Sequence, residues 1–368
     1  MSKLKEKVAK VGEKAADKLP RKLRRSKKEE SPTRITNDTI AEHREKILTE
    51  GRKFKYPFQY AKHKILINTI IVVVITTISF GGWLWFMLYH KQATGDFFYS
   101  ATKILSLPVA NVDGQKVPYA DYLRRLRSVI FYKEHRDQEK VDFGTPDGQR
   151  VLDYLKRNEM NRAQRTAYAT KIAKKQNITV SDEEIDSEID KNLKTDSGET
   201  MTRADYEKYV LGQYFGWTMN DYRAELKNQL LEKKVAFAVD EAAKSKIEKA
   251  ETRLKAGENF AKVASELSDD EATSEAGGGV SARTGDVDPS GLIAIARNLN
   301  AGETSGIIQG VDGYYIVKLD SKTDNTTKYF MIKIALTQFD NDFNKLREAG
   351  KIKECIKIPK PEDIEGAS

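Results

Sequence analysis

The chain has 368 residues, 39% hydrophobic and 32% charged, which is enough for two or three compact units with a very polar surface. Its net charge of +8 comes from one end: residues 1–64 hold 20 Lys and Arg against 9 Asp and Glu, so the rest carries −3. The single cysteine, Cys355, excludes an internal disulfide, so folded parts must be stabilised by core packing.

The basic segment 1–64 is expected to be a cytoplasmic tail. Apolar residues from Leu4 to Leu19 recur at roughly helical spacing between lysines. Such a segment can lie on anionic lipid headgroups, bind nucleic acid, or remain solvated and act only as a topology signal. The last alternative is favoured. Because no aromatic residue is interleaved with the early basic residues, no nucleic-acid partner is expected.

The run Ile65–Tyr89 has no charged residue. Its 25 residues exceed what a hydrocarbon core of about 30 Å requires, and aromatic residues gather at its end, as at membrane interfaces. A buried core helix and a cleaved signal peptide are the less favoured alternatives. Lys and Arg crowd the side before the run. We therefore predict a single transmembrane helix over 65–89, with a cytoplasmic N-terminus and residues 91–368 extracytoplasmic.

After a connector at 90–107, a new unit begins at Pro108. Residues 109–112 followed by Asp113-Gly114 predict a strand and a tight turn. Helices are predicted over 119–135, 147–176, 182–194 and 203–215, and a last one opens at Thr218.

Three phrases carry a resemblance in this region: ANVDGQKVPYADY, KKQNITVSDEEIDSEI and GWTMNDYRAELKNQLLEKKV. Together they resemble the N-terminal helical domain of SurA/PrsA-type foldases, which implies a hydrophobic cradle for unfolded chains. An aromatic run either lines such a cradle or belongs to an ordinary helical core. Its members are Tyr206, Tyr209, Tyr214, Phe215 and Trp217.

Residues 254–319 carry LKAGENFAKVASELSDD, a Gly277–Gly279 turn, LNAGETS and GYYIVKL. In this order they resemble a parvulin-type (PpiC-type) peptidyl-prolyl isomerase domain. The family has a His after Gly-Tyr in its final strand, where this chain has Tyr315. The family's first strand is missing before the helix, but KYFMIKIAL at 328–336 resembles it. Either the sheet is circularly permuted, or this segment is an added edge strand.

The resemblance also implies site residues. The family's His and acid positions correspond to Tyr315, Lys333 and Asp270, which are the candidate catalytic residues. The apolar proline-contacting positions fall at Val280, Val287, Leu292 and Ile293. No cofactor or metal is expected, because proline isomerisation requires only a pocket that favours the twisted amide.

The sequence thus predicts an α+β protein with a transmembrane helix, a SurA-N-like helical chaperone domain and a small parvulin-like α/β domain. The expected function is a membrane-anchored extracytoplasmic foldase that binds unfolded or translocated polypeptides. An active isomerase and a scaffold for one protein partner are the alternatives. The expected domain boundaries are 1–64, 65–89, 90–107, 108–240, 241–345 and a C-terminal tail at 346–368.

Overall fold

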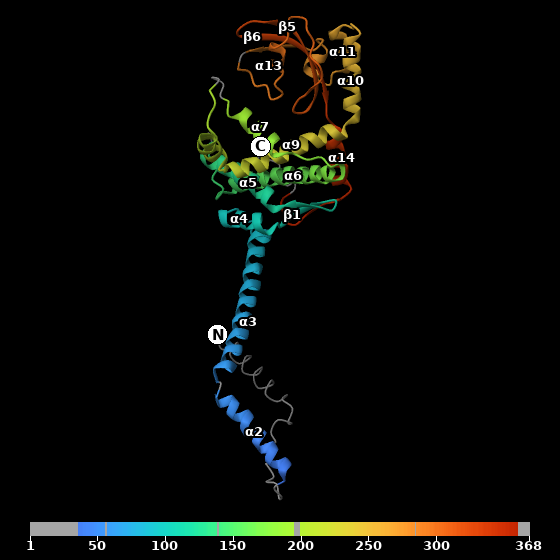
Figure 1. Ribbon diagram of the computed structural model, residues 1–368. Coiled ribbons are helices and arrows are strands. Elements are labelled where there is room, and N and C mark those ends of the chain that lie inside the picture. The colour runs from blue at the N-terminus through green and yellow to red at the C-terminus, as the bar shows by residue number, and fades with distance from the viewer. Residues whose placement is uncertain (1–35, 56, 138–139, 195–198, 284, 360–368) are drawn as a thin grey trace. The chain divides into compact units, whose positions relative to one another are not determined.

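The computed structural model describes residues 36–55, 57–137, 140–194, 199–283 and 285–359 (Figure 1). The expectations for the first part of the basic tail lie outside these residues. The chain divides into two compact units, residues 1–80 and 81–368, which are described separately.

The described residues of the first unit form helices. Helix α2 covers Asn37–Lys55, and α3 covers Pro57–Trp85, whose last turn belongs to the second unit. Within the described residues, one helical stretch, His63–His90, is long and apolar enough to cross a membrane, and its most apolar part is not buried at all. The alternative of a buried core helix is therefore wrong.

The second unit begins with the π-helical turn η2 (Phe86–His90) and helix α4 (Asp96–Leu105). Strands β1 (Pro108–Val112) and β2 (Gln115–Pro118) form the predicted hairpin, and both residues of its turn have positive φ, +46° at Asp113 and +91° at Gly114. This pair of angles is what a two-residue hairpin turn requires.

The predicted helices of this region are confirmed. They are α5 (Tyr119–His135), α6 (Pro146–Gln176), α7 (Asp182–Asn192) and α9 (Met219–Val239). Capping boxes begin α7 at Ser181 and α9 at Thr218, where a side-chain oxygen accepts an N–H of the first turn. The predicted helix over 203–215 is a short α8 (Arg203–Asp205) followed by π-helical η3 (Tyr206–Phe215). Helix α6 packs against both α5 and α9.

The parvulin-like unit follows directly. Its helices are α10 (Glu241–Lys255), α11 (Phe260–Leu267), α12 (Glu271–Ser274) and α13 (Leu292–Arg297). Its strands are β3 (Gly279–Arg283), β4 (Ile308–Gln309), β5 (Gly313–Lys322) and β6 (Thr326–Ala335), in the order β3-β6-β5-β4.

Strand β6 lies inside the sheet, antiparallel to both β3 and β5 (Figure 1). The last strand of this sheet in sequence, β6, therefore holds the central position beside β5 that the resemblance gives to the family's first strand. The circularly permuted arrangement is confirmed, and the alternative of an added edge strand is wrong. Two residues of the glycine turn, Gly277 and Gly278, have positive φ, +72° and +86°, which glycine adopts without strain.

The segment after β6 returns to the helical domain. Helix α14 (Gln338–Glu348) buries Phe339 against α6 and α9, and β7 (Ile352–Glu354) pairs antiparallel with β1. Ile356 and Ile358 are buried in the same core as Val109 and Tyr122. Residues 346–359 of the expected C-terminal tail therefore pack into the helical domain, and the expected domain end at 345 falls within α14. The described part of the tail completes the helical domain.

The parvulin-like unit is therefore inserted between α9 and α14. Asp240, only 2% exposed, lies where the chain enters this unit, and it also binds the segment by which the chain leaves it. Its carboxylate accepts the N–H groups of Ala243 at 2.9 Å, Thr337 at 2.8 Å and Gln338 at 3.0 Å. Insertion needs the two ends of a domain to lie close together. The permuted order meets that need because the chain leaves the unit by a strand running back toward Asp240.

Candidate functional site

Two of the three expected catalytic residues are brought together by the sheet. Tyr315 on β5 and Lys333 on β6 are register partners, and the Lys333 ammonium lies 5.9 Å from the centre of the Tyr315 ring. A third residue, Asp312, joins them. It accepts a hydrogen bond from the Tyr315 hydroxyl at 2.5 Å and one from Lys333 Nζ at 2.6 Å. The resulting cluster is a Tyr–Asp–Lys set.

The charges of this set are balanced. Burial on its own would raise the pKa of Asp312, but hydrogen bonds from Lys333 and Tyr315 outweigh it and lower the pKa. Burial would likewise lower the pKa of Lys333, and its bond to Asp312 reverses the direction. The Tyr315 pKa is raised by burial and by Asp312. At neutral pH the set is therefore a carboxylate, an ammonium and a neutral phenol, which presents hydrogen-bond donors rather than a proton acceptor with a pKa near 7.

Asp270 has other contacts. Its carboxylate accepts the Thr273 hydroxyl at 2.5 Å at the start of α12, and its neighbour Asp269 accepts the N–H of Ala335 at 3.0 Å. The described contacts connect Asp270 to neither Tyr315 nor Lys333, so its catalytic role stays a prediction.

The four apolar candidates differ in accessibility. Leu292 is buried in the core that also holds Tyr315 and Val317, and Val280 and Ile293 pack partly against that core. Val287 is 91% exposed. Leu292, Val280 and Ile293 thus all belong to the same core as Tyr315, and Val287 does not. Their role in binding proline also stays a prediction.

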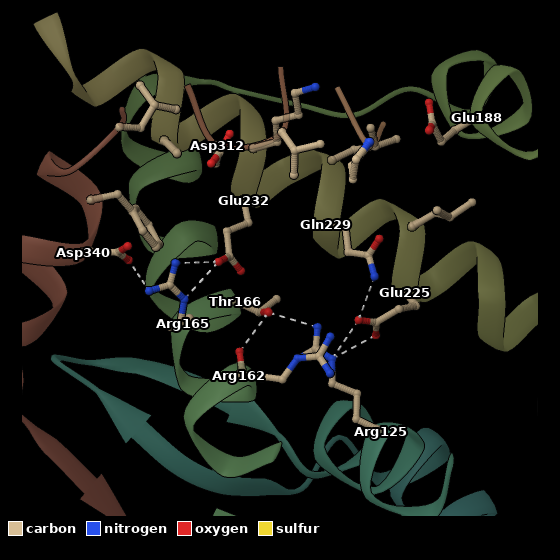
Figure 2. A pocket seen from close by; sticks show the side chains of 18 residues that line it. Arg125, Arg162, Arg165, Thr166, Glu188, Glu225, Gln229, Glu232, Asp312 and Asp340 are labelled. Atoms are coloured by element: carbon tan, nitrogen blue, oxygen red, sulfur yellow. Dashed lines mark hydrogen bonds and ion pairs between the residues drawn. The ribbon is translucent and has the colours of Figure 1, made fainter. Parts of the chain in front are cut away.

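A cavity of about 570 Å³ adjoins the Tyr–Asp–Lys set (Figure 2). One wall comes from α6, α9 and α14, and the other from loop residues Pro289, Val311 and Asp312 of the parvulin-like unit. Asp312 is therefore both a member of the set and part of the cavity wall. Through this shared residue, the candidate isomerase site lies at the edge of a cavity that the helical domain also lines.

The helical wall is strongly charged. Arg125 donates from Nε to both Glu225 oxygens at 2.9 Å and from a terminal nitrogen to the Thr166 hydroxyl at 3.0 Å (Figure 2). Arg165 donates to Glu232 at 3.1 Å and also pairs with Asp340. Apolar Leu230, Ala236 and Phe339 line the same cavity. Such a wall offers apolar contact as well as polar groups to an extended chain.

The aromatic run on η3 is only partly core. Tyr209, Tyr214 and Phe215 are 46%, 45% and 39% exposed, and Leu211 is the buried residue of the element. Trp217 is half-buried and donates from its indole to the Arg124 carbonyl at 3.2 Å. Tyr206, in contrast, packs against the core of α7 and α9, so the run is partly core and partly exposed surface.

Sequence reasoning missed Asp312 and Asp240. Asp312 precedes Gly313, and an Asp-Gly pair is typical of turns, so its type and spacing do not mark it as a site residue. Among the described residues, no group of three or more His, Cys, Asp and Glu is arranged to hold a metal ion.

Comparisons with known proteins agree with this architecture. A family model described as the SurA-like N-terminal domain matches residues 58–236, and one described as the PPIC-type PPIase domain matches residues 230–321. The second match ends before β6, as expected if that strand lies outside the family's usual order.

A relative and a solved structure are similar to the chain. Foldase protein PrsA of Caldanaerobacter subterraneus subsp. tengcongensis is 29% identical over 227 residues, which cover 58% of this chain and 74% of the relative. A crystal structure of foldase protein PrsA from Streptococcus pneumoniae has 21% identity, covers 56% of this chain and 77% of its own, and has a TM-score of 0.18. The chain thus matches a SurA-like N-terminal domain followed by a PPIC-type PPIase domain, and these two matches and the PrsA relative support a SurA/PrsA-type foldase with a parvulin-type domain.

Proposed function

We propose that this protein is a membrane-anchored, extracytoplasmic foldase that holds unfolded or translocated polypeptides in the cavity between α6, α9 and the parvulin-like unit. The observation that carries the proposal is that Asp312 belongs both to the Tyr–Asp–Lys set and to the wall of this cavity. A chain in the cavity would contact the helical domain and the isomerase-like sheet together.

The exposed aromatics of η3 support binding of unfolded chains. Large apolar side chains on a surface commonly mark an interaction site. Aromatic residues contribute much contact area for little lost side-chain freedom. The arginine–carboxylate pairs along the cavity wall would form hydrogen bonds with the N–H and C=O groups of the client backbone.

The membrane anchor is supported by the apolar stretch His63–His90, and the orientation by the basic residues before it. The exposed thiol of Cys355 offers a direct test. A membrane-impermeant maleimide added to intact cells should label Cys355 of the native protein. Labelling only after lysis would place this domain inside the cell.

The holding function is tested with the full chain in lipid nanodiscs and several unrelated aggregating clients. We expect suppression of aggregation that weakens in a Tyr209→Ser, Tyr214→Ser double variant. Tyr154→Ser is the matched control, because Tyr154 is equally exposed, at 44%, but lies on α6. Absence of protection at equimolar ratio would refute the holding function, and protection of one protein alone would favour the scaffold alternative.

Isomerase activity is the second candidate, and the Tyr–Asp–Lys set favours it. Catalysis must lower a barrier of about 18–20 kcal/mol by favouring the twisted amide. The Tyr315 hydroxyl and the Lys333 ammonium are donors that could reach the amide oxygen. A panel of proline tetrapeptides should be isomerised faster than without protein, with the rate lost in Tyr315→Phe and Lys333→Met.

Aspartate variants separate the two possible acids. If the set is the site, Asp312→Asn lowers the rate and Asp270→Asn does not. If Asp270→Asn alone abolishes the rate, the family's acid position operates instead. A folded wild type with no rate above the uncatalysed one leaves the sheet as a binding module.

A further inference from the structure

Helix α4 leaves three large apolar side chains exposed, although Phe98 and Ala101 of the same helix pack against the core. Its buried residues are Tyr99 and Thr102. Its exposed residues include Phe97, Ile104 and Leu105, which are 52%, 81% and 51% exposed. A surface helix in water normally buries its apolar side and exposes its polar side.

The inward side of α4 is held by polar contacts. The Tyr99 hydroxyl donates to Asp221 at 2.5 Å, and Lys103 Nζ donates to the same carboxylate oxygen at 2.8 Å. The Thr102 hydroxyl donates to the Tyr99 carbonyl at 2.7 Å. Because Asp221 is itself buried and begins α9, these bonds fix the rotation of α4 about its axis. The outward direction of the apolar side is therefore built into the domain.

The apolar residues form a single stripe. Phe97 and Ile104 are seven residues apart, which returns a helix to nearly the same direction after two turns. Leu105 adjoins Ile104 on this side, where Ser100 is also exposed, whereas Ala101 is half-buried and packs against the core.

The stripe is continuous with the end of the apolar span. Residues 91–95 separate η2 from α4 and can reach at most about 17 Å. The actual approach is closer, since the ring centre of Trp83 lies 6.0 Å from that of Phe97 and 5.7 Å from that of Phe98. The end of the span also exposes three aromatic residues before this stripe: Trp83, Trp85 and Phe86. Trp residues at the end of a membrane helix lie at the level of the lipid headgroups.

We propose that α4 is an interfacial helix whose Phe97–Ile104–Leu105 stripe enters the outer lipid leaflet beside the span. This inference depends on the proposed membrane anchor. A helix of this kind places its apolar side about 5–10 Å into the boundary between headgroups and acyl chains. With α4 fixed to α5 and α9 through Tyr99 and Asp221, the lipid surface would set the orientation of the whole foldase domain.

The test uses the full chain in nanodiscs, with Cys355→Ser and one new cysteine carrying an environment-sensitive fluorophore. Three positions are compared: Ile104→Cys on the stripe, Ile75→Cys in the middle of the span, and Val311→Cys. Val311 is a matched control because it is 56% exposed and apolar but lies in the parvulin-like unit. Each label is exposed in turn to aqueous iodide, to a lipid quencher near the headgroup and to one near the acyl terminus.

We expect the label at 104 to be quenched most by the shallow lipid quencher, that at 75 by the deep one, and that at 311 by iodide. If 75 is quenched by lipid but 104 is quenched by iodide, α4 lies in water and the inference fails while the anchor holds. If 104 is protected from all three quenchers, protein covers the stripe, most simply a second copy, and the inference also fails. If neither 75 nor 104 meets a lipid quencher, the anchor itself is wrong.

Discussion

The helical domain and the parvulin-like sheet both pair a carboxylate with cations, but in different surroundings. In the helical domain, Glu225 is 2% exposed, and Arg124 and Arg125 are each 4% exposed. In the sheet, the Lys333 side chain is 22% exposed and that of Asp312 is 56% exposed. The first set is removed from water, and the second remains in contact with it.

Because of this difference in burial, the two charged sets have different roles. Burial alone would raise the pKa of Glu225, and the two arginines outweigh it and lower the pKa, so all three groups stay charged. Such a buried set fixes α5 against α9 because no partner can leave without a large cost. The solvent-exposed pair of the sheet contributes little to stability and can exchange its hydrogen bonds with a bound chain.

Removing the buried acid should have the largest effect. Glu225→Gln leaves Arg124 paired with Asp121 and removes the ion pair of the buried Arg125, so we expect about 3–5 kcal/mol less stability. Urea unfolding of the detergent-solubilised chain measures it. Glu232→Gln is the control, since Glu232 pairs with Arg165 at a more exposed position. Equal losses in both variants would contradict the distinction by burial.

The connection between the two regions should show the next largest effect. Asp240→Ala removes an acceptor from three backbone N–H groups. Each such buried group costs about 1–3 kcal/mol when unpaired, and we expect a total near 3 kcal/mol. Hydrogen exchange at Thr337 and Gln338 should quicken before exchange in β5. Asp240→Asn, which keeps one acceptor oxygen, should lie between Ala and wild type, and unchanged exchange in both variants would count against the connection.

Acid should weaken the helical domain through Asp221. Burial would raise its pKa, but hydrogen bonds from Lys103, Tyr99 and Thr218 outweigh it and lower the pKa to about 2. A lowered pKa means that the stabilisation is present above the ordinary value near 3.8 and is lost as pH falls toward 2. The shift corresponds to about 2 kcal/mol.

Unfolding free energies measured between pH 5 and about pH 2 should therefore fall less steeply in Asp221→Asn than in wild type. The same slope in both proteins would show that Asp221 titrates as an exposed carboxyl does.

The smallest change in stability is expected in the exposed set. Lys333→Met should alter the unfolding free energy by no more than about 1 kcal/mol, as for surface pairs generally. Its effect should fall on function, as slower isomerisation or weaker client retention in nanodisc assays. A loss of stability comparable to that of Glu225→Gln would show that the Tyr–Asp–Lys set is structural.

Local chemistry in the sequence was enough for most elements. The Ser181–Glu184 capping box, the Asp113-Gly114 turn and the uncharged run Ile65–Tyr89 each act through neighbours in the chain. The permuted strand could be predicted because its resemblance to the family lies in a contiguous phrase. These features depend on a few adjacent residues, so they can be read before any tertiary contact is known.

Tertiary structure alone decided the rest. Asp312 meets Lys333 because the register of β5 and β6 brings them together, and Asp270 is held elsewhere by Thr273. The return of β7 to β1 joins residues more than two hundred positions apart. The outward apolar side of α4 follows from its bonds to Asp221. In each case a side chain's partner, and so its function, was set by packing between distant segments, which composition and spacing do not encode.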